Sequence, residues 1–213
     1  MVKEKSANYL HTILLAIVLV ILIAFLTYSY VQNKSNNLEE ESINFFKEYS
    51  IALNNIHVAS NLFNTASINL DVGTYYAQAK DYSYEYAISY FDLGKKQSLD
   101  ARELLIKTKM KLQNMRGTVQ NSFFKDDILN RIKQAESLVS VNDDLYLLID
   151  YQGKQLYEVN YGSESMAVEY KNKYDELIPS YNDKLKNLTE IQNKIDLYWD
   201  QDWYPEFEAT SAD

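Results

Sequence analysis

The sequence predicts an all-α protein, in which a single N-terminal transmembrane helix precedes an elongated, antiparallel, up-down-up-down four-helix bundle. Three observations lead to this fold class. The 213 residues include only 5 Gly and 2 Pro, too few for the frequent turns of a many-stranded β fold. One segment near the start is strongly apolar. The remainder of the chain repeats apolar residues at the helical period.

The composition also excludes several kinds of site. The chain has no Cys, which rules out disulfides, thiolate metal sites, a Cys nucleophile and a lipoprotein anchor. Two His residues are too few for a histidine metal site, so we expect no metal and no cofactor. The net charge of −9 argues against nucleic acid as a partner.

The apolar segment has the length and flanks of a membrane anchor. No charged residue lies between Lys5 and Lys34, and every residue from Ile13 to Leu26 is apolar. Residues 10–31 would span about 33 Å as a helix, enough to cross a bilayer, after a short tail at 1–9. A signal peptide cleaved after about residue 29 is the alternative, because Thr27 and Ser29 are small.

The charges beside this segment predict its orientation. Lys3 and Lys5 precede it, whereas Lys34 is followed by three glutamates, so a cytoplasmic N-terminus at the cell membrane and an external bundle are favoured. The N-x-S/T triplets at Asn33 and Asn187 are compatible with export.

Glycine and proline divide the rest of the chain into four segments of similar length. Gly73, Gly117, Gly162 and Pro205 follow one another at intervals of about 43–45 residues. Thr or Ser follows each glycine, so we expect left-handed glycines at the helix ends and N-caps directly after them. The predicted bundle covers residues 32–204, with helices of roughly 40 residues at about 35–72, 74–116, 119–161 and 163–203, and an acidic tail at 205–213.

Other residues refine this prediction. Antiparallel neighbours are favoured by the short connections, and an elongated pair of coiled-coil hairpins is the alternative. Gly94, Gly153 and Pro179 are expected to interrupt or kink their helices. Asn142 lies on an apolar stripe and is expected to fix the helix register. The pairs Asp126–Asp127 and Asp143–Asp144 are expected on a solvated face.

Tyrosines gather at the end of the predicted bundle that lies away from the membrane. The chain has 19 Tyr, and those in the second helix are too closely spaced to share one core seam. Tyrosine is common in recognition surfaces because it offers a large contact area at little entropic cost. Amphipathic packing is the alternative role. The candidate recognition surface comprises Tyr75, Tyr76, Tyr82, Tyr84, Tyr86, Tyr90, Tyr157, Tyr161 and Tyr170.

A second aromatic group lies at the opposite end of the predicted bundle. Trp199, Trp203 and Tyr204 are followed by an acidic tail. They form a candidate membrane-proximal patch at the lipid interface, an acidic and aromatic contact for a neighbouring subunit, or simply a packed helix end.

Motifs of enzymes are absent from the sequence. There is no metal-binding His pattern, no phosphate-binding glycine loop and no nucleophile elbow, and His57 lies alone on the first helix of the bundle. The sequence therefore predicts a protein that is not an enzyme.

The predicted function is a single-pass, membrane-anchored, extracytoplasmic binding or adaptor module that uses its Tyr-rich end. A protein partner or a second copy of the chain is expected. The first alternative is a structural or assembly subunit of a membrane complex or surface structure. The architecture also resembles the extracytoplasmic four-helix-bundle sensor domains of chemoreceptors and sensor kinases, although no motif supports this resemblance. With one predicted span and no signalling domain, such a sensor would act through a separate partner.

Overall fold

The computed structural model describes residues 42–79, 83–119 and 122–200 of the chain. The chain divides into two compact units, Met1–Glu48 and Tyr49–Asp213. In the first unit, the described residues 42–48 are helical, and the rings of Phe45 and Phe46 meet edge to face with centroids 5.5 Å apart. The helical bundle and the candidate site belong to the second unit.

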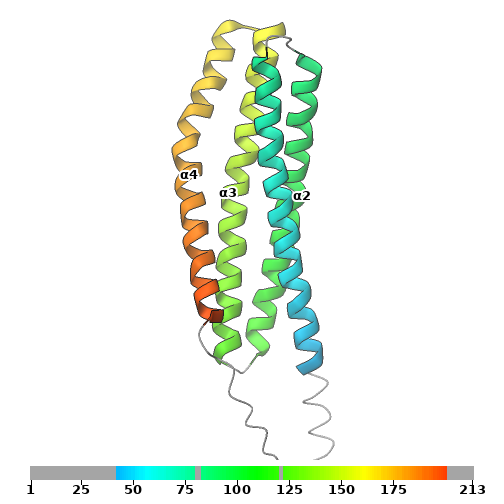
Figure 1. The fold of residues 1–213 in the computed structure, drawn as a ribbon, viewed down its shortest axis with the longest axis vertical. Coiled ribbons are helices and arrows are strands. Elements are labelled where there is room, and N and C mark those ends of the chain that lie inside the picture. Colours follow the sequence, from blue (N-terminus) through cyan, green and yellow to red (C-terminus); the bar gives the residue numbers. More distant parts are fainter. Residues whose placement is uncertain (1–41, 80–82, 120–121, 201–213) are drawn as a thin grey trace, which may run out of the picture. The chain divides into compact units, whose positions relative to one another are not determined.

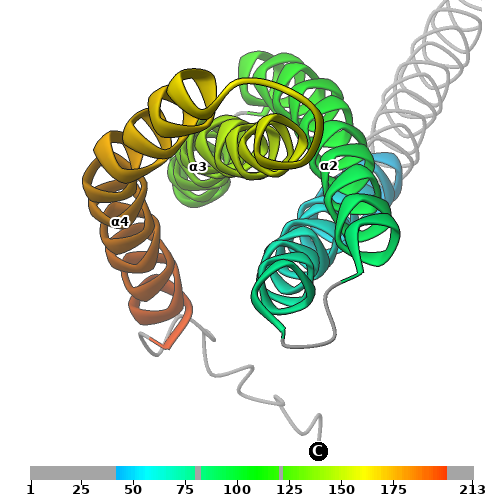
Figure 2. The ribbon, with the colours of Figure 1, turned by 90° about the horizontal axis from the view of Figure 1, so that it is seen from above.

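The described residues form four long helices and contain no strand. The first helix covers residues 42–78 and is followed by α2 (Tyr84–Thr118), α3 (Ser122–Tyr161) and α4 (Glu164–Asp200). The bundle helices run side by side in alternating directions (Figure 1). Seen from above, α3 lies between α2 and α4, and it packs against both (Figure 2). The prediction of a four-helix, all-α protein is confirmed.

None of the described helices combines the length and the apolar character that a bilayer span requires. The predicted anchor at residues 10–31, the tail at 1–9 and the acidic tail at 205–213 lie outside the described residues. They stay predictions.

Small residues line the face of the first helix that packs into the bundle. They recur every seven residues, and all are buried: Ala52, Ala59, Ala66 and Gly73. Small side chains at a heptad spacing allow two helix backbones to approach closely. At Gly94 of α2, an added Cβ would lie only 3.3 Å from the backbone oxygen of Ala66. Glycine at position 94 therefore permits this close contact between the first helix and α2.

The predicted turn at Gly73 is wrong, because the first helix continues past it to residue 78. A Cβ at position 73 would lie 2.5 Å from the ring of Phe91, which is almost fully buried. Gly73 is therefore needed to make room for Phe91. The chain turns instead between residue 78 and Tyr84, and the side chain of Ser83 accepts a hydrogen bond from the backbone N–H of Tyr86, as an N-cap residue does.

The other proposed helix breakers also lie inside or beside continuous helices. Helix α2 runs unbroken through Gly94, and α4 continues through Pro179. Helix α2 ends at Thr118, and α4 begins after Ser163, whose carbonyl accepts the first helical hydrogen bond. No glycine among the described residues has a positive φ, so the left-handed conformation expected at the helix ends is wrong there.

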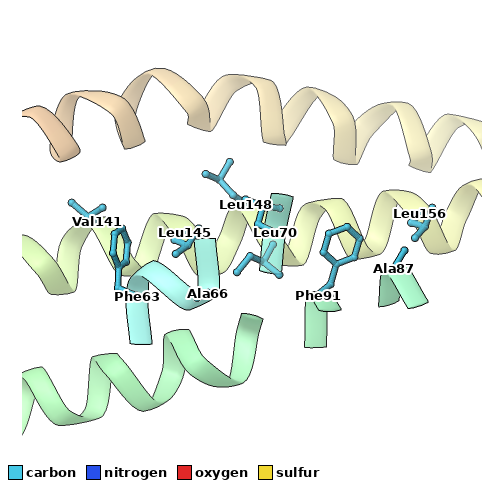
Figure 3. Close-up of a cluster of buried hydrophobic side chains, with 10 residues drawn as sticks. Phe63, Ala66, Leu70, Ala87, Phe91, Val141, Leu145, Leu148 and Leu156 are labelled. Atoms are coloured by element: carbon cyan, nitrogen blue, oxygen red, sulfur yellow. The ribbon is translucent and has the colours of Figure 1, made fainter. Parts of the chain in front are cut away.

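The hydrophobic core lies along α3. Ten buried side chains from the first helix, α2 and α3 form one cluster, of which Figure 3 labels nine. Helix α4 contributes side chains that are only partly buried against this cluster. These are Tyr174, Leu177, Ile178, Tyr181, Leu185 and Leu188. The apolar stripe of α4 is therefore covered less completely than those of the other helices.

Two aspartates expected on a solvated face are buried. Asp127 is fully buried and lies 3.7 Å from the Nε of Arg131, whose pKa is lowered by burial. Asp144 is 6% exposed and accepts hydrogen bonds from Ser180 and Lys184 of α4. The neighbouring residue Asp143 does face solvent, in a 2.7 Å ion pair with Arg102. One residue of each pair thus faces inward, because adjacent helical residues diverge by about 100°.

Candidate functional site

The tyrosines predicted as a recognition surface meet at one end of the bundle. The end of the first helix and the start of α2 lie at the same end of the bundle as the connection between α3 and α4 (Figure 1). We call this the Tyr-rich end and define it by eight described tyrosines. They are Tyr75, Tyr76, Tyr84, Tyr86, Tyr90, Tyr157, Tyr161 and Tyr170. The ninth candidate, Tyr82, lies outside the described residues.

Four of these tyrosines present most of their surface to solvent. The exposed fractions are 69% for Tyr75, 63% for Tyr86, 52% for Tyr157 and 67% for Tyr161. The other four are partly buried. The exposed tyrosines come from the first helix, α2 and α3, so they do not form a stripe along a single helix.

Stacked rings join the first helix to α2. The rings of Tyr76 and Tyr90 are nearly parallel, at 5°, with centroids 5.6 Å apart. Tyr86 lies 5.8 Å from Tyr76 on the same side, and Tyr75 meets Tyr76 edge to face at 5.7 Å. Contacts of this kind contribute about 0.5–1.5 kcal/mol beyond area burial. They bring the exposed rings of Tyr75 and Tyr86 into contact with the partly buried ring of Tyr76.

A second aromatic group joins α2 to α3. Tyr84 meets Tyr161 edge to face at 5.0 Å, and Tyr157 lies 5.7 Å from Tyr161. A third group joins α3 to α4, where Tyr151 stacks on Tyr170 at 6.5 Å. The ammonium groups of Lys154 and Lys173 lie 5.7 and 5.3 Å from the centre of the Tyr170 ring. Tyrosine rings thus join the first helix to α2, α2 to α3, and α3 to α4.

A pocket of about 220 Å³ opens between α2 and α3 within the Tyr-rich end. Its lining combines aromatic and charged side chains: Tyr84, Ile88, Phe91, Asp92, Lys95, Asp150, Gly153, Lys154, Tyr157 and Glu158. A Cβ on Gly153 would lie 3.7 Å from Phe91, an ordinary contact distance, so Gly153 leaves space in the pocket that a side chain would fill.

Both lysines of the pocket are already paired with carboxylates. Lys154 donates to Asp150 at 2.6 Å, and this hydrogen bond raises the pKa of Lys154. The Nζ of Lys95 lies 3.3 Å from the Oδ1 of Asp92 and 3.8 Å from the Oδ1 of Asp150. The remaining carboxylate, Glu158, accepts a 2.9 Å hydrogen bond from the backbone N–H of Ser163. It has no basic partner among the described residues.

No pattern in the sequence predicts this pocket. Phe91, Asp150 and Glu158 belong to no recognised motif, and Gly153 was interpreted as a weak point of a helix. Their grouping depends on the register between α2 and α3, which no local spacing reveals. The nearest signal in the sequence was the concentration of tyrosines around them.

The other candidates do not add to this site. Trp203 and Tyr204 lie outside the described residues, and the side chain of Trp199 is likewise not described. His57 is exposed, and its ring lies within hydrogen-bonding distance, 3.2 Å, of Asn61. In the part of the chain that the structure describes, no group of three or more His, Asp or Glu side chains has the arrangement of a metal site.

Comparison with known proteins identifies no relative. No protein-family model matches the chain, and no curated protein or solved structure is significantly similar to it. The function is therefore inferred from the surface and chemistry of the molecule itself.

Proposed function

We propose that this protein is a non-enzymatic binding or adaptor module that recognises a protein partner through its Tyr-rich end. The observation that supports this most directly is the exposure of four tyrosines, Tyr75, Tyr86, Tyr157 and Tyr161, by more than half of their surface. Their rings belong to groups that link neighbouring helices.

Tyrosine suits such a surface for physical reasons. Its ring buries a large apolar area on binding, its hydroxyl forms hydrogen bonds, and it has few rotamers to lose. Ring contacts within the Tyr-rich end restrict these rotamers before binding, which lowers the entropic cost of association. Connected long helices provide a rigid support for the surface.

Membrane attachment is part of this proposal. The apolar stretch at residues 10–31 supports a single membrane anchor, and the lysines before it support a cytoplasmic N-terminus. With that orientation, the bundle would lie outside the cell and present the Tyr-rich end away from the membrane.

A structural or assembly subunit is the second candidate function. The observation in its favour is the apolar stripe of α4, where Tyr174, Leu177, Tyr181 and Leu185 remain only partly buried. A neighbouring subunit that packed laterally against α4 would cover this stripe.

Site-specific photo-cross-linking tests the proposed function. A photoreactive benzoylphenylalanine is placed at position 161, in the Tyr-rich end, in cells that naturally make the protein. The matched control is position 110, because Met110 is 58% exposed on α2. We expect a discrete cross-linked protein from position 161 and none from position 110. Equal labelling at both positions would contradict the proposal. The same photoreactive residue is also placed at position 177 of α4, and a product from that position alone would favour the assembly subunit.

A further inference from the structure

We infer that the pocket between Tyr84 and Tyr157 receives a basic side chain, preferably an arginine, from the protein that binds the Tyr-rich end. This inference rests on the proposed function and adds the chemistry of the partner. It draws on three features of the pocket, namely its charge balance, its aromatic walls and its size.

The charge balance of the pocket leaves one carboxylate without a cation. Asp92 and Asp150 are matched by Lys95 and Lys154, through distances of 2.6 to 3.8 Å. Within the described part of the chain, the one hydrogen-bond donor to the carboxylate of Glu158 is the backbone N–H of Ser163, at 2.9 Å from its Oε2. A carboxylate can accept several hydrogen bonds, so Glu158 retains the capacity to bind a positively charged donor.

The surroundings of the pocket add to this negative charge. At the start of α4, Lys171 and Lys173 form ion pairs with Asp175 and Glu169 within their own helix. Two exposed carboxylates in the first turns of α2 and α4, Glu85 and Glu164, have no ion pair among the described residues. Lys96 is exposed but does not line the pocket. A basic partner would therefore be attracted to this end of the molecule.

The walls of the pocket favour a guanidinium group. Tyr84 and Tyr157 line it, and the buried ring of Phe91 contributes an apolar surface. A planar guanidinium stacks on aromatic rings and forms two parallel hydrogen bonds to a carboxylate. The aliphatic part of an arginine side chain would contact Ile88 and Phe91.

The size of the pocket fits one side chain rather than a peptide segment. A volume of about 220 Å³ accommodates a single long side chain. Tyr157 lines the pocket and its exposed ring contacts that of Tyr161, so both rings would contact the partner surface around the inserted residue. Arginine is also enriched among the residues that dominate protein interfaces.

An anionic group is the competing occupant, because two lysines line the pocket. Both lysines already bind Asp150, and an anion would also face Asp92 and Glu158. The net charge of the five charged side chains, three carboxylates and two lysines, is thus negative, which disfavours an anion.

Peptide binding to the full chain in a non-ionic detergent tests this inference. The probes are three fluorophore-labelled hexapeptides composed of arginine, of citrulline, which has a similar shape but no charge, or of glutamate. Fluorescence anisotropy gives the Kd of each. We expect the arginine peptide to bind about tenfold or more tightly than the citrulline peptide. Tighter binding of the glutamate peptide, or equal binding of arginine and citrulline, would overturn the inference.

Two variants locate the binding at the pocket. Glu158→Gln removes the charge but keeps an oxygen that accepts the Ser163 hydrogen bond, and Glu190→Gln makes the same charge change at an exposed position of α4. Gly153→Leu fills the pocket, and Gly117→Leu is its control, because a Cβ there meets nothing within 4 Å. Thermal unfolding by circular dichroism verifies that each variant folds.

We expect Glu158→Gln and Gly153→Leu to weaken arginine-peptide binding about fivefold to tenfold and the two controls to change it about twofold or less. If Glu158→Gln and Glu190→Gln weaken binding equally, attraction is non-specific and the inference is wrong. The peptide assay measures binding in the pocket, whereas cross-linking at position 161 detects a protein on the surrounding surface. Failure of the inference is therefore seen separately from failure of the proposed function.

Discussion

The side-chain amide of Asn142 on α3 donates a 2.7 Å hydrogen bond to the backbone carbonyl of Ser98 on α2, and both residues are almost fully buried. In return, the Ser98 hydroxyl lies 3.1 Å from the Oδ1 of Asn142 and 3.2 Å from its backbone oxygen. A shift of either helix by one turn would leave these buried polar groups without partners. Asn142 and Ser98 therefore act together in setting the register of α2 against α3.

This pair predicts a measurable energetic coupling. Asn142→Ala removes the hydrogen bonds of the side-chain amide with the carbonyl and the hydroxyl of Ser98 and creates a cavity, so we expect a loss of about 1–3 kcal/mol in the free energy of unfolding. Ser98→Ala alone should cost less. Urea unfolding of both single variants and the double variant gives the coupling energy. Additive losses would show that the two residues do not act as a pair.

Two glycines inside helices, the buried Gly73 and the partly buried Gly153, give opposite predictions. Gly73→Ala should destabilise the fold by about 1–3 kcal/mol, because its Cβ would lie 2.5 Å from the buried ring of Phe91. Gly153→Ala should stabilise it by about 0.5–1 kcal/mol, because alanine favours the helix and meets Phe91 only at 3.7 Å. Gly117→Ala, with no neighbour within 4 Å, is the control. Equal melting temperatures for the first two variants would refute this packing role of Gly73.

The polar contacts of Asp144 on α3 are expected to stabilise the packing of α4. The buried carboxylate of Asp144 accepts hydrogen bonds from Lys184 at 2.7 Å and Ser180 at 3.2 Å. Lys184→Met keeps the aliphatic part of the side chain but removes the ammonium group that pairs with the buried carboxylate. We therefore expect the free energy of unfolding to fall by about 1–3 kcal/mol. Hydrogen exchange should then increase in α4 around Pro179. Lys186→Met, at an exposed position, is the control, and equal exchange in the two variants would show that Asp144 does not hold α4.

Burial of Tyr181 predicts a loss of stability at alkaline pH. Burial raises the pKa of Tyr181, against the opposing effect of its hydrogen bond with Ser67. The folded state therefore holds the phenolic proton more tightly than the unfolded chain does. The resulting stabilisation is complete below the unfolded pKa of about 10 and is lost as the pH rises through the folded pKa.

Urea unfolding at pH 8 and near pH 11 tests this prediction. The stability advantage of the wild-type chain over Tyr181→Phe should shrink at the higher pH. Tyr161→Phe, at a largely exposed ring, serves as the control substitution. An advantage of Tyr181 that is unchanged between the two pH values would contradict the proposed effect of burial.

Helical periodicity and the shortage of turn residues were sufficient to predict the four long helices and the all-α class of the described residues. They could not distinguish a glycine that ends a helix from one that makes room for a neighbour. Gly73 is the fourth member of a seven-residue series with Ala52, Ala59 and Ala66. That series was the signal that the first helix would continue, and its meaning depends on Phe91, which lies 18 residues further along the chain.

The candidate site was predicted only in part for a related reason. Counting tyrosines located the surface, because long antiparallel helices bring the two connections to the same end. The exposure of each tyrosine could not be predicted from the sequence. Tyr84 is partly buried and contacts Tyr161 of α3, whereas Tyr86, two residues later, is exposed. The pocket beside them requires residues of two helices to be aligned, and local sequence does not specify that alignment.

If the exposed tyrosines bind a protein, their removal must weaken the affinity for the partner captured from position 161. Its Kd is measured for the full chain, for the triple variant Tyr86→Ser, Tyr157→Ser and Tyr161→Ser, and for a control with Leu99→Ser and Met110→Ser on exposed parts of α2. We predict a loss of about a hundredfold or more in the triple variant and little change in the control. A triple variant that folds and binds the partner as tightly as the wild-type chain would contradict the claim.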